Sequence, residues 1–417
     1  MSNPVPSQPP APVKDNPYEV LRNRDFTQYM TGRFISAFSQ QMLALAVGWD
    51  VYNRTKSPRA LGLVGLAQVL PMFLFTFHAG HLADNHSRNK IMVWMQILVA
   101  VAGSILALDI WFHLGVSYVY FALFLLGTSR TYGWAASAAF VPQLVPRELF
   151  PLAVSWNTAA FQIASVTGPA VGGALIAWLG KVFWIYAFNA SAGILCAILF
   201  LNLKVHHKVK SREPMSLKSV IVGLKFVYHT KVVLGSITLD MFAVLLGGAS
   251  ALLPVYAKDI LNTNPSGLGW LQAALPIGSM CMSLLLLHQP PMKNAGATLL
   301  WAVAGFGLAT VGFGLSRNIY LSFTMLFICG ATDYISVIVR QTMIQLKTPD
   351  HMRGRVSAVN SLFIGTSNQL GEFESGMVAQ YTSPVFSVVS GGIGTILVVI
   401  TAAFIWPEIR NYKKLDS

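Results

Sequence analysis

The sequence has little charge and almost no cysteine. Of its 417 residues only 11% are charged, whereas a soluble domain carries about 25% charged residues. All three cysteines (Cys196, Cys281 and Cys329) fall in apolar runs, so neither a disulfide framework nor a thiolate metal cluster is indicated. The low charge excludes an ordinary soluble protein.

The chain also lacks the motifs of enzymes and of ATP-driven pumps. It has no glycine-rich phosphate loop, no recognisable Ser/His/Asp arrangement and no zinc-ligand spacing. The adjacent His206 and His207 lie in a basic stretch, which favours solvated side chains over metal ligands. We therefore expect no enzymatic activity, no cofactor and no bound metal.

Long apolar runs dominate instead. The chain is 54% hydrophobic, and about twelve windows reach the roughly 20 apolar residues that a membrane-spanning helix needs. We predict an all-α membrane protein with twelve transmembrane helices in two pseudo-symmetric six-helix bundles. The predicted spans are 26–52, 61–83, 91–112, 118–141, one that begins near 150, 183–203, 232–256, 268–287, 297–315, 320–346, 356–381 and 385–406.

Polar segments divide the chain into five parts. Residues 1–22 are rich in proline and polar side chains, which predicts a disordered cytoplasmic tail without a cleavable signal peptide. The basic stretch 205–218 is the predicted cytoplasmic linker between an N-terminal bundle at 23–204 and a C-terminal bundle at 219–407. Residues 408–417 form a second cytoplasmic tail.

The two predicted bundles are related by an internal repeat. A shift of 203 residues superimposes several glycine, proline and asparagine positions, which shared hydrophobicity alone does not explain. The matching pairs are Gly127 and Gly330, Pro146 and Pro349, Asn157 and Asn360, Gly168 and Gly371, and Gly173 and Gly376. A parallel repeat of this kind is typical of transporters in which two bundles rock about a site near the membrane midplane.

The distribution of basic residues predicts the orientation. With both termini in the cytoplasm, most of the Lys and Arg residues between the spans fall on the cytoplasmic side. This is the positive-inside rule, so the net charge of +13 is explained by topology and does not indicate a nucleic-acid partner.

A short charged turn between the second and third spans carries a family motif. Gly80, Leu82, Ala83, Asp84 and Arg88 match the loop signature of major facilitator superfamily transporters, while three neighbouring positions depart from it. Further segments follow in the order seen in one branch of that superfamily: 23–26, 49–52, 61–65, 144–148, 168–169 and 353–356. The chain resembles the branch of bacterial exporters that includes drug:proton antiporters, enterobactin exporters, macrolide efflux proteins and lysophospholipid transporters.

This resemblance implies a gate and a kink. Asp84, with Gly80 and Arg88 in the same loop, is expected to pair with the start of the eleventh helix on the cytoplasmic side, where Arg353 and Arg355 precede that start. Gly168 and Pro169 resemble the Gly-Pro signature that kinks the fifth helix of antiporter-type members. The alternatives are a simple loop carboxylate and an ordinary Gly-Pro pair of a membrane helix.

Charged residues inside the spans are candidates for binding substrate or protons, because each costs at least ~2.5 kcal/mol to insert. Arg130 and Asp333 occupy equivalent positions in the two halves, and by the resemblance their helices line the central cavity. We expect them to face one another across it, and the alternative is a structural salt bridge. Asp50 and Asp109 lie near the outer ends of their helices, where we expect them to be hydrated.

Four more charged residues belong to this group. Asp240 is either a proton acceptor or an interfacial carboxylate paired with Lys231 or Arg340, and Arg340 is expected to act as a cytoplasmic gate or an anion contact. Glu372 and Glu374 point about 200° apart on one helix, so they form no dyad and only one can face the cavity.

These observations favour a secondary transporter that works by alternating access. The leading hypothesis is proton-coupled efflux of an amphipathic small molecule from the bacterial inner membrane, by a monomer surrounded by lipid. A lysophospholipid transporter without strict proton coupling and a non-transporting membrane sensor remain as alternatives. A divalent-metal exporter is disfavoured because buried His and Cys ligands are scarce.

Overall fold

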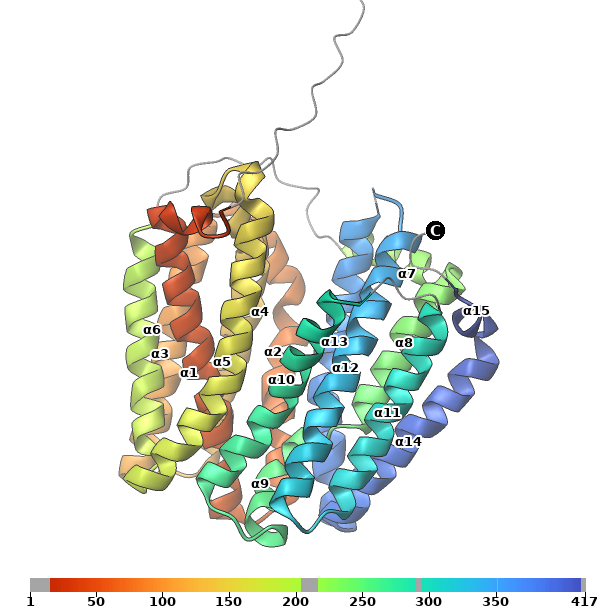
Figure 1. The fold of residues 1–417 in the computed structure, drawn as a ribbon. Coiled ribbons are helices and arrows are strands. Elements are labelled where there is room, and N and C mark those ends of the chain that lie inside the picture. The colour runs from red at the N-terminus through yellow and green to blue at the C-terminus, as the bar shows by residue number, and fades with distance from the viewer. Residues whose placement is uncertain (1–15, 204–216, 290–293, 351, 414–417) are drawn as a thin grey trace, which may run out of the picture.

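The computed structural model describes residues 16–203, 217–289, 294–350 and 352–413, and within these ranges every regular element is a helix. Figure 1 shows two bundles side by side. The first bundle contains α1 (Arg24–Thr55), α2 (Pro58–Asn85), α3 (Arg88–Phe112), α4 (Val116–Leu144), α5 (Phe150–Leu179) and α6 (Phe183–Leu201). Short 3-10 turns precede α1 (η1, Glu19–Arg22) and α5 (η2, Arg147–Leu149).

The second bundle repeats this arrangement. It contains α8 (Lys231–Leu246), α10 (Pro265–Leu287), α11 (Ala295–Leu315), α12 (Ile319–Lys347), α13 (Arg353–Tyr381) and α14 (Pro384–Ile405). Two helices lie outside the spans: α7 (Leu217–His229) packs against α13, and α15 (Pro407–Arg410) follows α14. The twelve predicted spans are all present, in two bundles of six. All but the last two residues of the predicted linker at 205–218 lie outside the described residues.

Length and composition alone single out nine membrane-crossing helices in the described part of the chain. The three others, α1, α4 and α13, have 32, 29 and 29 residues and are long enough to cross, and α1 and α13 are markedly more polar than the nine. Arg130 interrupts the apolar run of α4. A transmembrane helix is polar where it faces protein or water and not lipid. We therefore expect these three helices to face protein or water over part of their surface.

The seventh predicted span is interrupted, which the sequence analysis missed. We expected one helix over 232–256, but α8 ends at Leu246 and is followed by η3 (Ala249–Leu252), α9 (Leu253–Val255) and the π-helix η4 (Tyr256–Ile260). The break falls at Gly247–Gly248. A Cβ on Gly248 would lie 2.5 Å from the backbone of Gly371 in α13, so the chain bends where a neighbouring helix comes closest.

The end of the predicted disordered tail is ordered. Residues 19–22 form η1, and the side chain of Val20 is completely buried. The ring of Tyr18 packs against Trp156 of α5, whose indole nitrogen donates a hydrogen bond to the Pro17 carbonyl oxygen. The apolar side chains in this short segment find a surface on the first bundle, so the tail prediction extended too far along the chain.

Glycines at equivalent positions make equivalent contacts in the two bundles. A Cβ on Gly127 of α4 would lie 2.6 Å from the backbone oxygen of Gln68 in α2, and Gly330 of α12 meets the backbone of Leu275 in α10 in the same way. Because the added carbon would strike the backbone, the neighbouring helix cannot move aside by changing a rotamer. The repeat found in the sequence is therefore a repeat of helix contacts.

Two further glycine contacts join the bundles. At the α5–α10 seam, a Cβ on Gly269 would lie 2.5 Å from the Pro169 carbonyl oxygen. At the α2–α13 seam, a Cβ on Gly376 would lie 2.6 Å from the Cα of Gly62. Small residues allow such close approach of membrane helices. These two seams hold the bundles together and are related by the pseudo-symmetry of the molecule.

Replacing Gly269 by alanine should destabilise the protein by about 1–3 kcal/mol, because the new methyl group has no space beside the Pro169 carbonyl. The measurement is the thermal unfolding midpoint of the purified protein in detergent. Gly133→Ala in α4 is the matched control, since no atom lies within 4 Å of its added Cβ and alanine is the better helix former. Equal midpoints for the two variants would contradict the role of the seam.

Candidate functional site

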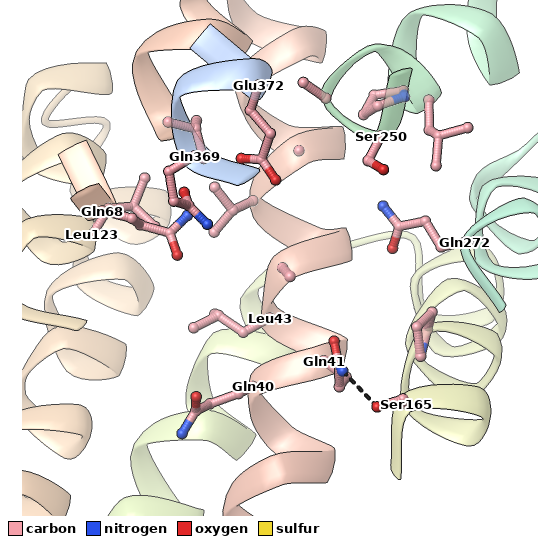
Figure 2. A pocket seen from close by; sticks show the side chains of 18 of the residues that line it. Gln40, Gln41, Leu43, Gln68, Leu123, Ser165, Ser250, Gln272, Gln369 and Glu372 are labelled. Atoms are coloured by element: carbon pink, nitrogen blue, oxygen red, sulfur yellow. Dashed lines mark hydrogen bonds between the residues drawn. The ribbon is translucent and has the colours of Figure 1, made fainter. Parts of the chain in front are cut away.

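A cavity of about 460 Å³ lies between the two bundles. The first bundle lines it with α1, α2, α4 and α5, and the second with η3, α9, α10 and α13. Figure 2 shows part of its lining, with polar side chains pointing into the space between the helices. This volume is within the range of small-molecule sites, roughly 300–1,000 Å³.

One positive and one negative residue belong to the lining, and they come from opposite bundles. Arg130 of α4 and Glu372 of α13 both line the cavity and interact electrostatically. We expected Asp333 opposite Arg130, and this pairing is wrong in the structure: Asp333 is not among the lining residues. Glu374, two residues from Glu372, instead accepts a hydrogen bond of 3.4 Å from Ser375, so only one of the two glutamates faces the cavity.

Asp333 belongs to a charge cluster inside the second bundle. Arg340 of α12 is 2% exposed and forms a 2.9 Å ion pair with Asp240 of α8. Its guanidinium also donates to Asn360 of α13 at 3.3 Å. Asp333 interacts electrostatically with both Asp240 and Arg340. Of the two alternatives for Asp240, the structure shows the one in which it pairs with Arg340. The cluster contains two carboxylates, Asp240 and Asp333, and one guanidinium.

The Asp240–Arg340 pair should be essential for stability. Asp240→Asn leaves the Arg340 guanidinium buried without its counter-charge, which costs about 3–5 kcal/mol. Thermal unfolding of the purified protein measures the loss. Glu408→Gln is the control, because it breaks the 3.0 Å Lys231–Glu408 pair at an exposed site and should leave the midpoint nearly unchanged. A similar midpoint for both variants would refute this role of the buried pair.

The predicted gate residues surround the α2–α3 turn and the start of α13. Only His86 and Ser87 separate α2 from α3, as expected for a tight turn, and Arg88 donates to the Ala83 carbonyl oxygen at 3.4 Å. Arg353 pairs with Asp350 at 2.9 Å, both exposed, and Arg355 contacts Met352. Gly80 is buried in α2. The side chain of Asp84 lies outside the described part of the structure, so its contact with α13 stays a prediction.

The Gly-Pro pair of α5 lies between two helices. A Cβ on Gly168 would lie 2.6 Å from the Gln41 side chain of α1, while the Pro169 carbonyl contacts α10. Pro169 is inside α5 and also lines the cavity. The pair therefore lies where α5 contacts α1 of its own bundle and α10 of the other bundle. The kink of α5 stays a prediction.

Asp50 and Asp109 are buried, contrary to the expectation that they are hydrated. Their exposed fractions are 6% and 0%. Arg54 bridges them, at 3.0 Å to Asp50 and 2.6 Å to Asp109, and Tyr186 of α6 donates to Asp50 at 3.1 Å. Arg54 follows Asp50 by one helical turn, so the Asp50–Arg54 pair could be predicted from the sequence. The rest of the network depends on α3 and α6 packing against α1.

Hydrogen bonds between the bundles gather at the face opposite the chain termini, where Figure 1 shows the bundles close together. The Tyr52 hydroxyl at the end of α1 donates to Asp259 of η4, and Lys258 donates to Asn53. Ser57 donates to Gln380 near the end of α13 at 2.7 Å. We call these contacts the opposite-face latch. The latch joins the two bundles beyond the cavity.

Removing the Tyr52 hydroxyl should favour opening at this face. A hydrogen bond to a charged carboxylate contributes about 1.5–3 kcal/mol, so Tyr52→Phe should raise the open population roughly tenfold or more. Labelling of Ser250→Cys, in the cavity lining, by a membrane-impermeant maleimide from that face measures this population, with exposed Cys281 replaced by serine. Tyr120→Phe is the control, since its 3.0 Å hydrogen bond to Ala60 lies within one bundle. Equal labelling rates would argue against the latch.

Several cavity residues were missed by the sequence analysis. Five glutamines line the cavity: Gln40, Gln41, Gln68, Gln272 and Gln369. An ionisable residue inside a span is recognisable as a candidate because its charge is costly in the membrane. A neutral glutamine has no charge and does not stand out in this way. The useful signal was the lower hydropathy of α1 and α13, which are less apolar than the membrane-crossing helices around them.

Comparison with known proteins places this architecture among transporters. The sequence profile of the family described as transmembrane secretion effectors, a group within the major facilitator superfamily, matches residues 16–417. The enterobactin exporters EntS of Shigella dysenteriae serotype 1 and of Escherichia coli K12 are each 25% identical to this chain over 393 residues, which is 93% of each protein.

Solved structures show the same fold at low sequence identity. A bacterial homologue of the human lysosomal transporter Spinster, in an inward-facing and unoccupied conformation, has a TM-score of 0.72 at 14% identity and covers 94% of this chain and 99% of its own. A bacterial homologue of the iron transporter ferroportin has a TM-score of 0.69 at 18% identity, with coverages of 91% and 98%.

Proposed function

Because the chain belongs to the transmembrane secretion effector family of major facilitator transporters, we propose that it exports an amphipathic small molecule in exchange for protons. It is a multi-pass membrane transporter of a small-molecule substrate and not an enzyme. The names of its 25% identical relatives favour a siderophore over other drug-like substrates, and a bacterial inner membrane as its location. The basic residues between the spans support cytoplasmic termini.

The observation that carries this proposal is that Arg130 and Glu372, which have opposite charges, line the cavity from different bundles. The two residues come from different bundles, so rocking of the bundles changes their separation. At bilayer depth each charge is costly without a counter-charge. A substrate group that binds Arg130 therefore competes with Glu372 for the guanidinium.

Asp333 is our candidate for the transported proton. Asp240 already has Arg340 as counter-ion, so an ionised Asp333 leaves the cluster with one uncompensated negative charge. One proton on Asp333 balances it. Asp240 is the second candidate, because it is the other carboxylate of this cluster. In this mechanism Arg340 sets the charge of the proton site and does not contact substrate.

The remaining predicted residues would control access. We propose that Asp84, in the loop with Gly80 and Arg88, contacts the start of α13 when the terminal face closes, because a helix N-terminus favours an anion. Arg353 and Arg355 lie at that start. The opposite-face latch would break as this contact forms. One chain encloses the whole cavity, which supports a monomer in contact with membrane lipids as the working unit.

Uptake of enterobactin into inside-out vesicles tests the proposal. We expect a proton gradient to drive uptake by the wild-type protein, and Glu372→Gln to reduce it at least tenfold because Arg130 loses its exchange partner. Asp333→Asn should abolish the effect of the gradient while leaving binding of enterobactin intact. Glu374→Gln is the matched control, since Glu374 lies on the same helix outside the cavity.

Two outcomes would overturn the proposal. Wild-type uptake that persists after the gradient is collapsed would replace proton exchange by facilitated transport, and a parallel assay with a lysophospholipid would then test the lipid-transport alternative. Unchanged uptake by Glu372→Gln would show that the charge pair does not take part in the cycle.

A further inference from the structure

The cavity is unusually rich in amide side chains. The five glutamines that line it come from α1, α2, α10 and α13, whereas Arg130 and Glu372 are its two charged residues and Phe161 its one aromatic residue. Hydrophobic cations are recognised by aromatic faces and by carboxylates without a counter-charge. This cavity offers one aromatic ring, and its carboxylate already faces an arginine. Its chemistry favours hydrogen bonding to an uncharged ligand.

Three of these amides have unused hydrogen-bonding capacity. Gln40 and Gln41 donate to Ser36 and Ser165, at 3.1 and 2.9 Å. In the described part of the chain, the side chains of Gln68, Gln272 and Gln369 make no hydrogen bond to protein, and the Gln369 oxygen is buried.

All three side chains are half-buried, and in the described structure the Gln369 oxygen is their one buried polar atom without a partner. Leaving such an atom unpaired is costly, because an amide has two donors and an oxygen that accepts two bonds. Groups of this kind in a native protein call for an explanation such as a ligand or bound water. The position of these three amides in the lining points to a ligand.

The arrangement of the three amides suits a ligand held from two sides. Gln68 of α2 and Gln272 of α10 correspond in the two halves at an offset of 204 residues, one more than the shift of the other matching pairs. Figure 2 shows Gln68 and Gln369 on one side of the cavity and Gln272 on the other, with their amide groups turned toward the space between them. A ligand with several amide or hydroxyl groups can therefore bond to both bundles at once.

We infer that Gln68, Gln272 and Gln369 form a recognition site for an uncharged ligand with several amide or hydroxyl groups. The inference rests on the proposed transport function and specifies its substrate class. The amides discriminate because a ligand that enters without matching donors leaves them unpaired in the closed cavity, which costs far more than a missing apolar contact. Arg130 and Glu372 then serve the exchange cycle, and the glutamines select what is exchanged.

Binding to the purified protein in lipid nanodiscs, without any gradient, tests this inference. The probes are dansyl-triglycine amide and its N-methylated counterpart dansyl-trisarcosine amide, which lacks the three backbone N–H donors, with ethidium as a hydrophobic cation. We expect the wild-type protein to bind the triglycine probe about tenfold more tightly than the other two. Gln68→Met and Gln272→Met preserve side-chain length but not hydrogen bonding, and each should bring the ratio of triglycine to trisarcosine affinity close to one.

The control is Gln345→Met, an exposed glutamine of α12 outside the cavity, which should keep the tenfold preference. Thermal unfolding midpoints confirm that the variants are folded. The inference is overturned if the double variant Gln68→Met/Gln272→Met keeps the preference, if the wild-type protein binds neither neutral probe, or if ethidium binds most tightly. Failure of proton coupling appears only in the vesicle assay, so the two proposals fail in different experiments.

Discussion

The structure depends on helices that approach one another closely at glycine. In a membrane there is little hydrophobic force between helices, so association depends on packing and on hydrogen bonds. Gly269 against Pro169 and Gly376 against Gly62 bring backbones into contact at the two seams between the bundles. Because the two seams are related by pseudo-symmetry, the same kind of close glycine contact joins the bundles on both sides of the cavity. A cavity between two such seams can change shape by rocking while the packing inside each bundle is kept.

The distribution of polar residues follows from the same arrangement. Helices that face lipid are apolar, and helices that face the cavity can carry glutamines, an arginine and a glutamate because other protein groups surround them. The buried charges outside the cavity are paired: Arg54 bridges Asp50 and Asp109 in the first bundle, and Arg340 pairs with Asp240 in the second. Asp333 is half-buried near the second pair, and we propose it as the proton site for that reason.

Two sets of inter-bundle interactions have different roles. The opposite-face latch involves Tyr52, Lys258 and Ser57, and these polar contacts can be exchanged for water when the bundles part at that face. Arg130 and Glu372 lie at the cavity itself, where we propose that they take part in the exchange cycle. The broken seventh span connects the two sets, since its π-helix η4 supplies Asp259 to the latch and its 3-10 segment supplies Ser250 to the cavity lining.

The sequence by itself determined the number of spans, the two-bundle fold, the repeat and the transporter class. Apolar run length and glycine spacing are local properties of the chain, and the bilayer requires each run to be a helix. Only the tertiary structure decided which charges meet. Equivalent positions gave Arg130 and Asp333 as partners, but Asp333 lies outside the cavity lining, near Asp240 and Arg340, and Glu372 is the carboxylate that lines the cavity with Arg130. Three other features also depend on residues that are distant in the sequence: the break at Gly248, the burial of Asp50 and the convergence of five glutamines. Some of these neighbours are hundreds of residues away, so a local sequence pattern cannot predict the contacts.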